Sequence, residues 1–249
     1  MDFTNLRELL DHFTSWRIPG CACAVYYKHR LVFSSASGYA DVERGIPMDC
    51  DRNIMYMYSC SKPVTCASAL MLWEKGKFLF TDPLYDFLPA WKDARVRALD
   101  GDGRETTVPL EHPITVGELF TMTSGLDYNT NGASFAAAKE RLAPECPTVD
   151  MINALAGDPL FRQPGGGWFY GMSHDVLAAV VEVISGMSLR DFAKKNIFEP
   201  LGMEDTEYCG GVIKDSGRAA VLYQFSDETG KYSPIDVQRN GMIFGTEYA

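Results

Sequence analysis

Ser59 and Lys62 form the one Ser-x-x-Lys sequence in the chain, and this spacing suits nucleophilic catalysis. If a helix begins near Ser59, the two side chains lie on one face of it, with their Cβ atoms roughly 5–6 Å apart. The N-terminus of a helix carries unpaired N–H groups and about half a positive charge, which favours a developing alkoxide on the serine. The pair therefore predicts a serine nucleophile with an amine beside it.

The amine of Lys62 can accept the serine proton only if its pKa falls from ~10.4 toward 7. A fall of that size corresponds to roughly 4 kcal/mol and requires burial and nearby positive potential. The alternative is a surface lysine one turn after a serine that caps the helix. The tetrapeptide alone leaves both interpretations open, because serine and lysine are common residues.

The elements expected around this pair are an early hairpin and then a series of helices. A helix is expected over residues 1–17, followed by two β-prone runs, Cys21–Tyr27 and Leu31–Ser37, that predict an antiparallel hairpin. Apolar spacing predicts a helix over Pro63–Lys75 that stops at Gly76. Six further elements are expected. They are a short helical segment at 81–89, a charged exposed excursion at 93–113, a helix from Thr115 to about 123, and helices at 148–157, 174–186 and 189–197.

This order predicts an α/β (α+β) fold, in which an antiparallel sheet is flanked by helices and accompanied by a mostly helical subdomain. The 249 residues, 46% hydrophobic and 22% charged, are typical of a folded globular protein. The formal net charge of −10 argues against nucleic-acid and membrane-surface partners. The start of the chain lacks a secretory signal pattern, and Val176–Val181 is far too short an apolar run for a membrane span.

Cysteine and histidine usage argues against metal chemistry. The seven cysteines form an odd set without a Cys-x-x-Cys pair, which predicts free thiols in a reducing, cytoplasmic compartment. The four histidines are scattered, and none lies at ligand spacing from a cysteine. The triple glycine at 165–167 lacks the Lys-Ser/Thr that a phosphate-binding loop needs. We therefore expect no metal and no cofactor.

Four stretches of the chain, in this order and at this spacing, resemble one known family. They are Ile18–Gly20 running into the hairpin, Tyr58–Thr65 around the nucleophile, Leu119–Leu126, and Pro200–Thr206. Together they resemble the serine β-lactamase and penicillin-binding-protein-like superfamily, particularly its class C β-lactamase and family VIII esterase branch. The resemblance extends over nearly the whole chain and implies a β-lactamase-like fold.

The resemblance also implies roles for five residues. Ser59 corresponds to the nucleophile that accepts the acyl group, and Lys62 to its proton-accepting partner. The family's second motif, Tyr-x-Asn or Tyr-x-Ser, corresponds here to Tyr-Gly-Met, so that Tyr170 is the tyrosine that shuttles a proton between serine and leaving group. Substrate contact is expected at Met172, which cannot hydrogen-bond an amide as asparagine would, and at the adjacent Ser173.

Two alternatives concern the same segment. Tyr170 could be a buried aromatic residue beside Trp168 and Phe169. His174 and Asp175 suggest a Ser-His-Asp triad, but adjacent helical residues point in different directions and cannot both line up behind one serine. We therefore expect His174 to open a helix that packs into the core.

The family's third motif, Lys-Thr-Gly or His-x-Gly on a late strand, has no counterpart after residue 200. The last residues, 245–249, resemble the approach to the family's glycine-rich segment. The resemblance thus implies one truncated domain over 1–249 without the late C-terminal strands. Its expected parts are an N-terminal helix and hairpin (about 1–58), a nucleophile helix with the helical subdomain (about 59–210), and a partial return to the sheet (211–249).

Missing strands have two consequences. The late strand provides one of the family's two oxyanion-hole N–H groups, and loss of one such donor costs on the order of 3–4 kcal/mol. The exposed edge of the hairpin also invites pairing, so a second chain or a swapped dimer could complete the sheet.

The sequence supports three hypotheses of function. The first is a serine hydrolase that acts on small carboxylic esters through a Ser59 acyl-enzyme. The second is a β-lactamase or penicillin-binding D-peptidase, which the absent signal pattern and Met172 disfavour. The third is a non-catalytic fragment, or one half of an assembly, because the third motif is missing.

Overall fold

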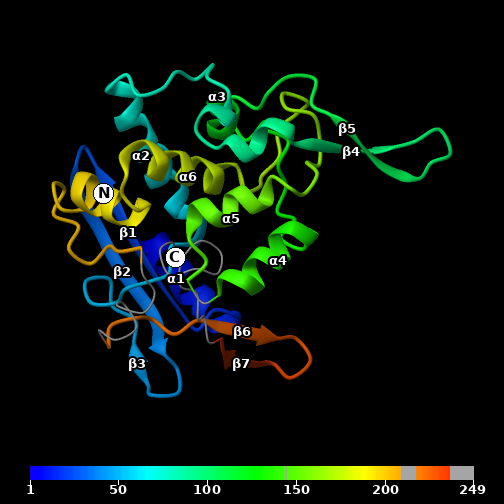
Figure 1. Ribbon diagram of the computed structural model, residues 1–249. Helices are drawn as coiled ribbons and strands as arrows, with labels where there is room; N and C mark the ends of the chain where they lie inside the picture. The colour runs from blue at the N-terminus through cyan, green and yellow to red at the C-terminus, as the bar shows by residue number, and fades with distance from the viewer. Residues whose placement is uncertain (144, 209–216, 236–249) are drawn as a thin grey trace. The chain divides into compact units, whose positions relative to one another are not determined.

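The computed structural model describes residues 1–143, 145–208 and 217–235, which form two compact units (Figure 1). The first unit contains the described residues of Met1–Tyr56 and Gly210–Gln238. The second contains those of Met57–Cys209. The expected return to the sheet at 211–249 lies partly outside the described residues, and the final segment at 245–249 lies wholly outside them.

The first unit is built on the expected hairpin. Strands β1 (Gly20–Tyr27), β2 (Arg30–Asp41) and β3 (Ile46–Pro47) form an antiparallel sheet in the order β1-β2-β3. The β1–β2 turn consists of Lys28 and His29, both with positive φ (48° and 61°), as a two-residue turn that matches strand twist requires. The predicted hairpin is confirmed, and both strands extend further than the β-prone runs.

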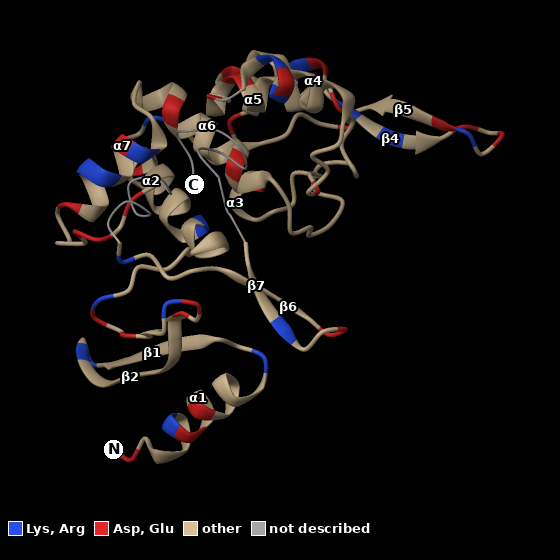
Figure 2. Cartoon of the chain, turned by 90° about the horizontal axis from the view of Figure 1, so that it is seen from below, with Lys and Arg blue, Asp and Glu red and all other residues tan. Residues whose placement is uncertain are grey.

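Helix α1 (Thr4–Trp16) and a second hairpin complete this unit. The helix lies against β1 and β2 and buries Leu10 (Figure 2). The second hairpin pairs β6 (Tyr223–Ser226) with β7 (Lys231–Pro234). It is tied to the rest of the unit where Arg17 forms an ion pair of 2.8 Å with Asp227.

The second unit is mostly helical, as expected. Its α-helices are α2 (Lys62–Glu74), α3 (Val116–Phe120), α4 (Ala133–Leu142), α5 (Thr148–Leu155), α6 (Ser173–Ser185) and α7 (Leu189–Ala193). Its shorter turns are the 3-10 segments η1 (Tyr58–Ser61), η2 (Leu84–Asp86) and η3 (Pro89–Asp93), and a π-helical turn, η4 (Lys194–Phe198). One hairpin, β4 (Arg95–Leu99) with β5 (Glu105–Pro109), extends from it.

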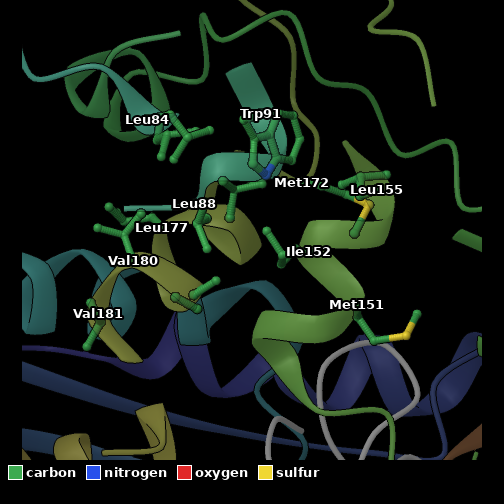
Figure 3. Close-up of a cluster of buried hydrophobic side chains, with 14 of the residues drawn as sticks. Leu84, Leu88, Trp91, Met151, Ile152, Leu155, Met172, Leu177, Val180 and Val181 are labelled. Atoms are coloured by element: carbon green, nitrogen blue, oxygen red, sulfur yellow. The ribbon is translucent and has the colours of Figure 1, made fainter. Parts of the chain in front are cut away.

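Helix α6 is the centre of the hydrophobic core in this unit. Every residue from Val176 to Val181 is fully buried. Helices α2, α3 and α5 pack around it, and Leu84 of η2, Trp91 of η3 and Leu88 between these turns contribute to the same core (Figure 3). Because α2 begins next to Ser59 and α6 begins next to Tyr170, this packing fixes the two segments relative to each other.

Two elements of this unit differ from the sequence expectation. The charged excursion at 93–113 forms the β4–β5 hairpin, in which Val96 is buried between the exposed Arg95 and Arg97. Helix α4 was not expected at all. Its first N–H groups, those of Ser134 and Phe135, donate to the carboxylate of Asp158 (2.9 Å each), so its N-terminus is capped by a residue distant in the chain.

Two loops of this unit, residues 121–128 and 161–172, are joined along their length. Five backbone N–H groups of the second loop donate to carbonyl oxygens of the first: Phe161 and Arg162 to Gly125 (3.0 and 3.3 Å), Gly165 to Thr123 (2.8 Å), Phe169 to Met122 (2.9 Å) and Met172 to Asp127 (3.2 Å). The buried hydroxyls of Ser124 and Ser173 add a hydrogen bond of 2.9 Å at the start of α6. These contacts hold Tyr128 and Tyr170 at fixed positions beside each other.

Gly125 is the point at which this joint can be tested. Its φ is +86°, and a Cβ added there would overlap the carbonyl oxygen of Arg162. We expect Gly125→Ala to lower the free energy of unfolding by about 3 kcal/mol or more, because backbone strain and a steric clash add. Gly186, with a φ of +67° and open space around its Cα, is the matched control, and Gly186→Ala should cost about 1–2 kcal/mol. Urea unfolding followed by circular dichroism measures both; equal losses would contradict the role of the joint.

Candidate active site

Ser59 is an exposed residue in the tight turn that leads into α2. The η1 turn (Tyr58–Ser61) runs directly into the helix, and the hydroxyl of Ser61 donates to the Tyr58 carbonyl oxygen at 2.7 Å. Tyr58 has a φ of +45°, which is uncommon for a residue with a bulky side chain. Strain of this kind, on the order of 1–3 kcal/mol, clusters at functional sites. The turn thus presents the Ser59 hydroxyl in a strained setting.

Lys62, the first residue of α2, lies beside this hydroxyl as the spacing predicts. Its Nζ donates to Ser59 Oγ across 3.4 Å. The side chain is half-buried, which removes the alternative of a lysine standing freely in solvent. The geometric expectation for the pair is confirmed.

Two tyrosine rings hold the Lys62 ammonium. Nζ lies 5.2 Å from the ring centroid of Tyr170 and 5.5 Å from that of Tyr128, distances typical of cation–π contacts. The two ring centroids are 5.6 Å apart. Tyr170 is 43% exposed, so the alternative of a buried aromatic residue is wrong. The structure brings Ser59, Lys62 and Tyr170 together and adds Tyr128.

The pKa values of the two phenols move in opposite directions. A hydrogen bond from Ser59 lowers the pKa of Tyr170; burial opposes this, and the positive charge of Lys62 adds to the lowering. Burial raises the pKa of Tyr128, against the hydrogen bond and charge of Lys62. Neighbouring groups whose pKa values are driven apart are suited to different roles in proton transfer. Tyr170 is the better proton acceptor, and Tyr128 stays protonated.

The pKa of Lys62 differs from the sequence expectation. Burial lowers it, but the hydrogen bond with Tyr128 and the negative potential of Asp175 outweigh burial, so the pKa is raised above its ordinary value. The residue therefore remains an ammonium group at neutral pH. It can stabilise a negative charge on Ser59 or Tyr170, but it is poorly suited to take up a proton.

Asp175 is the buried partner of this charge. It lies in the first turn of α6 with an exposed fraction of 6%. Burial raises the pKa of its carboxyl to about 6, although the charge of Lys62 pulls in the other direction. An ionised carboxylate in this position places negative potential behind the ammonium and helps to keep it charged.

His174 lies next to Asp175 but takes no part in the cluster. Its Nε2 lies 3.2 Å from the carbonyl oxygen of Phe120 and 3.5 Å from the sulfur of Cys66, while its buried Nδ1 has no hydrogen-bond partner. Burial lowers the pKa of the imidazole, so it is neutral. His174 lies in the first turn of α6 and is buried against the core, as expected. Its contacts do not form a Ser-His-Asp triad.

Met172 and Ser173 require a correction. Both have an exposed fraction of 0%, so neither side chain is accessible to a substrate. Met172 packs into the hydrophobic core (Figure 3), and Ser173 bonds to Ser124. The turn into α6 directs both side chains inward, because helix packing requires apolar contacts at that point.

Sequence reasoning missed Tyr128 and considered Asp175 only as a member of a Ser-His-Asp triad. Tyr128 follows the stretch Leu119–Leu126 by two residues, and its position after that motif was the available signal. Asp175 is a charged residue that directly precedes the apolar run Val176–Val181. A carboxylate at the start of such a run is a candidate buried charge that needs a cation.

Within 1–143, 145–208 and 217–235, no three His, Cys, Asp or Glu side chains are grouped so that they could hold a metal ion. In the same residues, no helix combines the length and apolar character that crossing a membrane requires.

Comparison with known proteins identifies the family. The model of the beta-lactamase family matches residues 6–240. The chain belongs to the beta-lactamase family. The family and the mixed α/β fold expected from the four sequence stretches are thereby confirmed.

The relatives of this beta-lactamase-family chain carry names of different enzymes. Esterase EstB of Burkholderia gladioli is 32% identical over 213 residues, which cover 83% of this chain and 50% of EstB. Penicillin-binding protein 4* of Bacillus subtilis is 30% identical over 181 residues, 71% of this chain and 35% of that protein. The solved structure of EstCE1, a hydrolase with promiscuous acyltransferase activity, matches with a TM-score of 0.73 and 26% identity over 96% of this chain and 60% of that one. The chain thus spans at most about half the length of these two curated relatives.

The buried carboxyl predicts a pH-dependent stability. Because the pKa of Asp175 is raised from 3.8 to about 6 by folding, its contribution is fully present below about pH 3.8 and is lost as the pH rises through 6. At pH 7.5 the ionised group costs the fold about 3 kcal/mol. We therefore expect Asp175→Asn to raise the free energy of unfolding by about 2–3 kcal/mol at pH 7.5 and by about 1 kcal/mol at pH 4.5.

Denaturant unfolding at the two pH values measures this difference. Asp150, an exposed residue in the first turn of α5, is the control. Asp150→Asn should change the stability by less than about 1 kcal/mol at either pH. A gain from Asp175→Asn that does not depend on pH would show that folding leaves the pKa of this carboxyl unchanged.

Proposed function

We propose that this chain is a serine hydrolase that cleaves small carboxylic esters through an acyl-enzyme on Ser59. One observation carries the proposal: the hydroxyl of Ser59 accepts a hydrogen bond of 3.4 Å from Lys62, whose ammonium also lies over the ring of Tyr170. A serine held between a cation and a phenol of lowered pKa is set up to lose its proton to the phenol.

The reaction proceeds by two acyl transfers. Ser59 Oγ bonds to the ester carbonyl carbon, and its proton passes to the phenolate of Tyr170 while the carbonyl oxygen becomes an oxyanion. The intermediate then expels the alcohol, whose oxygen takes the proton from Tyr170. Water next gives a proton to Tyr170 and attacks the acyl group, and Ser59 leaves with that proton.

Lys62 and Tyr128 keep their protons throughout this cycle. The positive charge of Lys62 stabilises the phenolate of Tyr170 and the developing alkoxide on Ser59, which supports a proton path without transfer to the amine. The ring of Tyr128 lies against the amine, with Nζ 5.5 Å from the ring centroid, and helps to hold its charge. In this mechanism the proton acceptor is Tyr170, whereas the family resemblance implied Lys62.

Esters are favoured over β-lactams by the second motif. Its third position is Met172, which is buried and offers no amide group to hold a substrate amide. The relatives include both a named esterase and a penicillin-binding protein, so a β-lactamase or D-peptidase is the alternative. Persistent penicillin adducts with turnover of esters would support the esterase, whereas rapid penicillin hydrolysis would overturn it.

Two finer points belong to this proposal. Among the described strands, β1 pairs with β2 alone, and we infer that a further strand, from a second chain or a swapped dimer, completes the sheet at its other edge. The odd number of cysteines supports a reducing compartment, and we propose the cytoplasm.

A fluorophosphonate probe tests the nucleophile. We expect the wild-type chain to gain the mass of one phosphonyl group and Ser59→Ala to gain none, because the probe bonds to an activated serine oxygen. Ser61→Ala is the matched control: its hydroxyl lies in the same turn but donates to a backbone carbonyl, so labelling should persist. Equal labelling of Ser59→Ala would remove Ser59 from the mechanism, and a folded wild-type chain without label would favour a non-catalytic fragment.

The pH dependence of acylation distinguishes Tyr170 from Lys62 as the base. Because the charge of Lys62 helps to lower the pKa of Tyr170, Lys62→Met should move the rise of the acylation rate to higher pH. Lys62→Arg keeps the charge but cannot accept a proton, so it should retain the wild-type profile at a reduced rate. Stopped-flow acylation between pH 5 and 10 measures both. Loss of the pH-dependent rise of the acylation rate in Lys62→Arg would identify Lys62 as the base.

A further inference from the structure

Trp168 is a large apolar side chain left on the surface beside the catalytic cluster. It is 64% exposed, and its ring centroid lies 6.3 Å from that of Tyr170, with the two rings tilted by 40°. Phe169, between them in the chain, instead packs against Phe161 with centroids 4.8 Å apart. The segment therefore turns Phe169 toward the protein and leaves Trp168 and Tyr170 accessible.

Trp168, Tyr170 and Tyr128 form a row of aromatic rings, which we name the aromatic row. Tyr170 is its middle member, with Tyr128 at 5.6 Å and Trp168 at 6.3 Å. The Lys62 ammonium lies over the Tyr128 and Tyr170 rings, so the polar part of the site is at that end of the row. Trp168, whose ring contacts that of Tyr170, is the apolar member of the row.

Exposed aromatic area next to a reactive group indicates contact with a ligand. An indole offers a wide face that gains free energy when a second apolar or aromatic group covers it, and surface aromatic clusters of this kind mark binding sites. Neither the hydrogen bonding of Ser59 nor the charge of Lys62 accounts for an indole at this position. A substrate group that lies on Trp168 would account for it.

We propose that Trp168 binds the leaving-group part of the ester and selects for aromatic or bulky apolar alcohols. This inference rests on the proposed function, in which Tyr170 gives its proton to the departing oxygen as the bond between carbonyl carbon and that oxygen breaks. The leaving oxygen must therefore lie at the Tyr170 hydroxyl. A group attached to that oxygen reaches the next ring of the aromatic row, which is Trp168.

This placement separates the two half-reactions. The leaving group is present while Ser59 is acylated and absent when water removes the acyl group. Trp168 should consequently affect acylation by aryl esters and leave deacylation unchanged. A residue that merely supported the fold, or one that contacted the acyl group, would alter both steps.

Two esters of one acid, 2-naphthyl acetate and ethyl acetate, test the inference, because they share an acetyl-enzyme. We expect Trp168→Ala to lower kcat/KM for 2-naphthyl acetate about tenfold and that for ethyl acetate by less than about twofold. The deacetylation rate should stay at the wild-type value, and Trp168→Phe should retain most of the preference. Trp16→Ala is the matched control, since Trp16 is 63% exposed on α1 and should affect neither ester.

Equal losses for the two esters, or a changed deacetylation rate, would overturn the inference. Fluorophosphonate labelling of Trp168→Ala at the wild-type rate would show that Ser59 remains reactive, which separates a failed inference from a failed function. If the chain does not hydrolyse these esters, their binding affinities can be measured instead. In Ser59→Ala, the affinity for 2-naphthyl acetate relative to ethyl acetate should fall about tenfold when Trp168→Ala is added, and an unchanged ratio would refute the proposal.

Discussion

The positive charge on Lys62 is the interaction on which the rest of the site depends. A half-buried ammonium needs compensation, and here it comes from two tyrosine rings and a buried carboxyl. Burial raises the pKa of Asp175 to about 6 against the charge of the ammonium, and that charge adds to the hydrogen bond from Ser59 in lowering the pKa of Tyr170. The hydrogen bond from Ser59 and the charge of the ammonium together make Tyr170 a better proton acceptor, and the ammonium also stabilises the serine oxygen that loses the proton.

The same segments that carry these groups also build the core. Helix α2 begins with Lys62 and packs against α6, which carries Asp175 in its first turn and follows Tyr170 in the chain. The joined loops 121–128 and 161–172 then set the distance between the two phenols. A change in core packing around α6 therefore alters the pKa values of the site. Close-packed interiors transmit small displacements of side chains, and few contacts separate the core from the titrating groups.

Membership of the beta-lactamase family is compatible with several chemistries, since its members here carry the names of esterases and penicillin-binding proteins. A common cluster explains how one fold serves both, because acyl transfer to a serine is shared by ester and β-lactam cleavage. Differences in specificity must then come from residues around the cluster. In this chain Met172 turns away into the core, and Trp168 stands exposed at the edge of the site.

The sequence by itself determined the features that depend on nearby residues: the β1–β2 hairpin, the helix after Ser59, and the closeness of Ser59 and Lys62 one turn apart. Features that depend on distant residues were decided by the tertiary structure. Helix α4 was missed because Asp158 caps it from another part of the chain, and Met172 was misplaced because core packing sets its direction. The pKa of Lys62 rises where a fall was expected, since its neighbours Tyr128 and Asp175 come from separate segments. Burial and electrostatic potential are sums over residues brought together by folding, and local spacing contains no information about them.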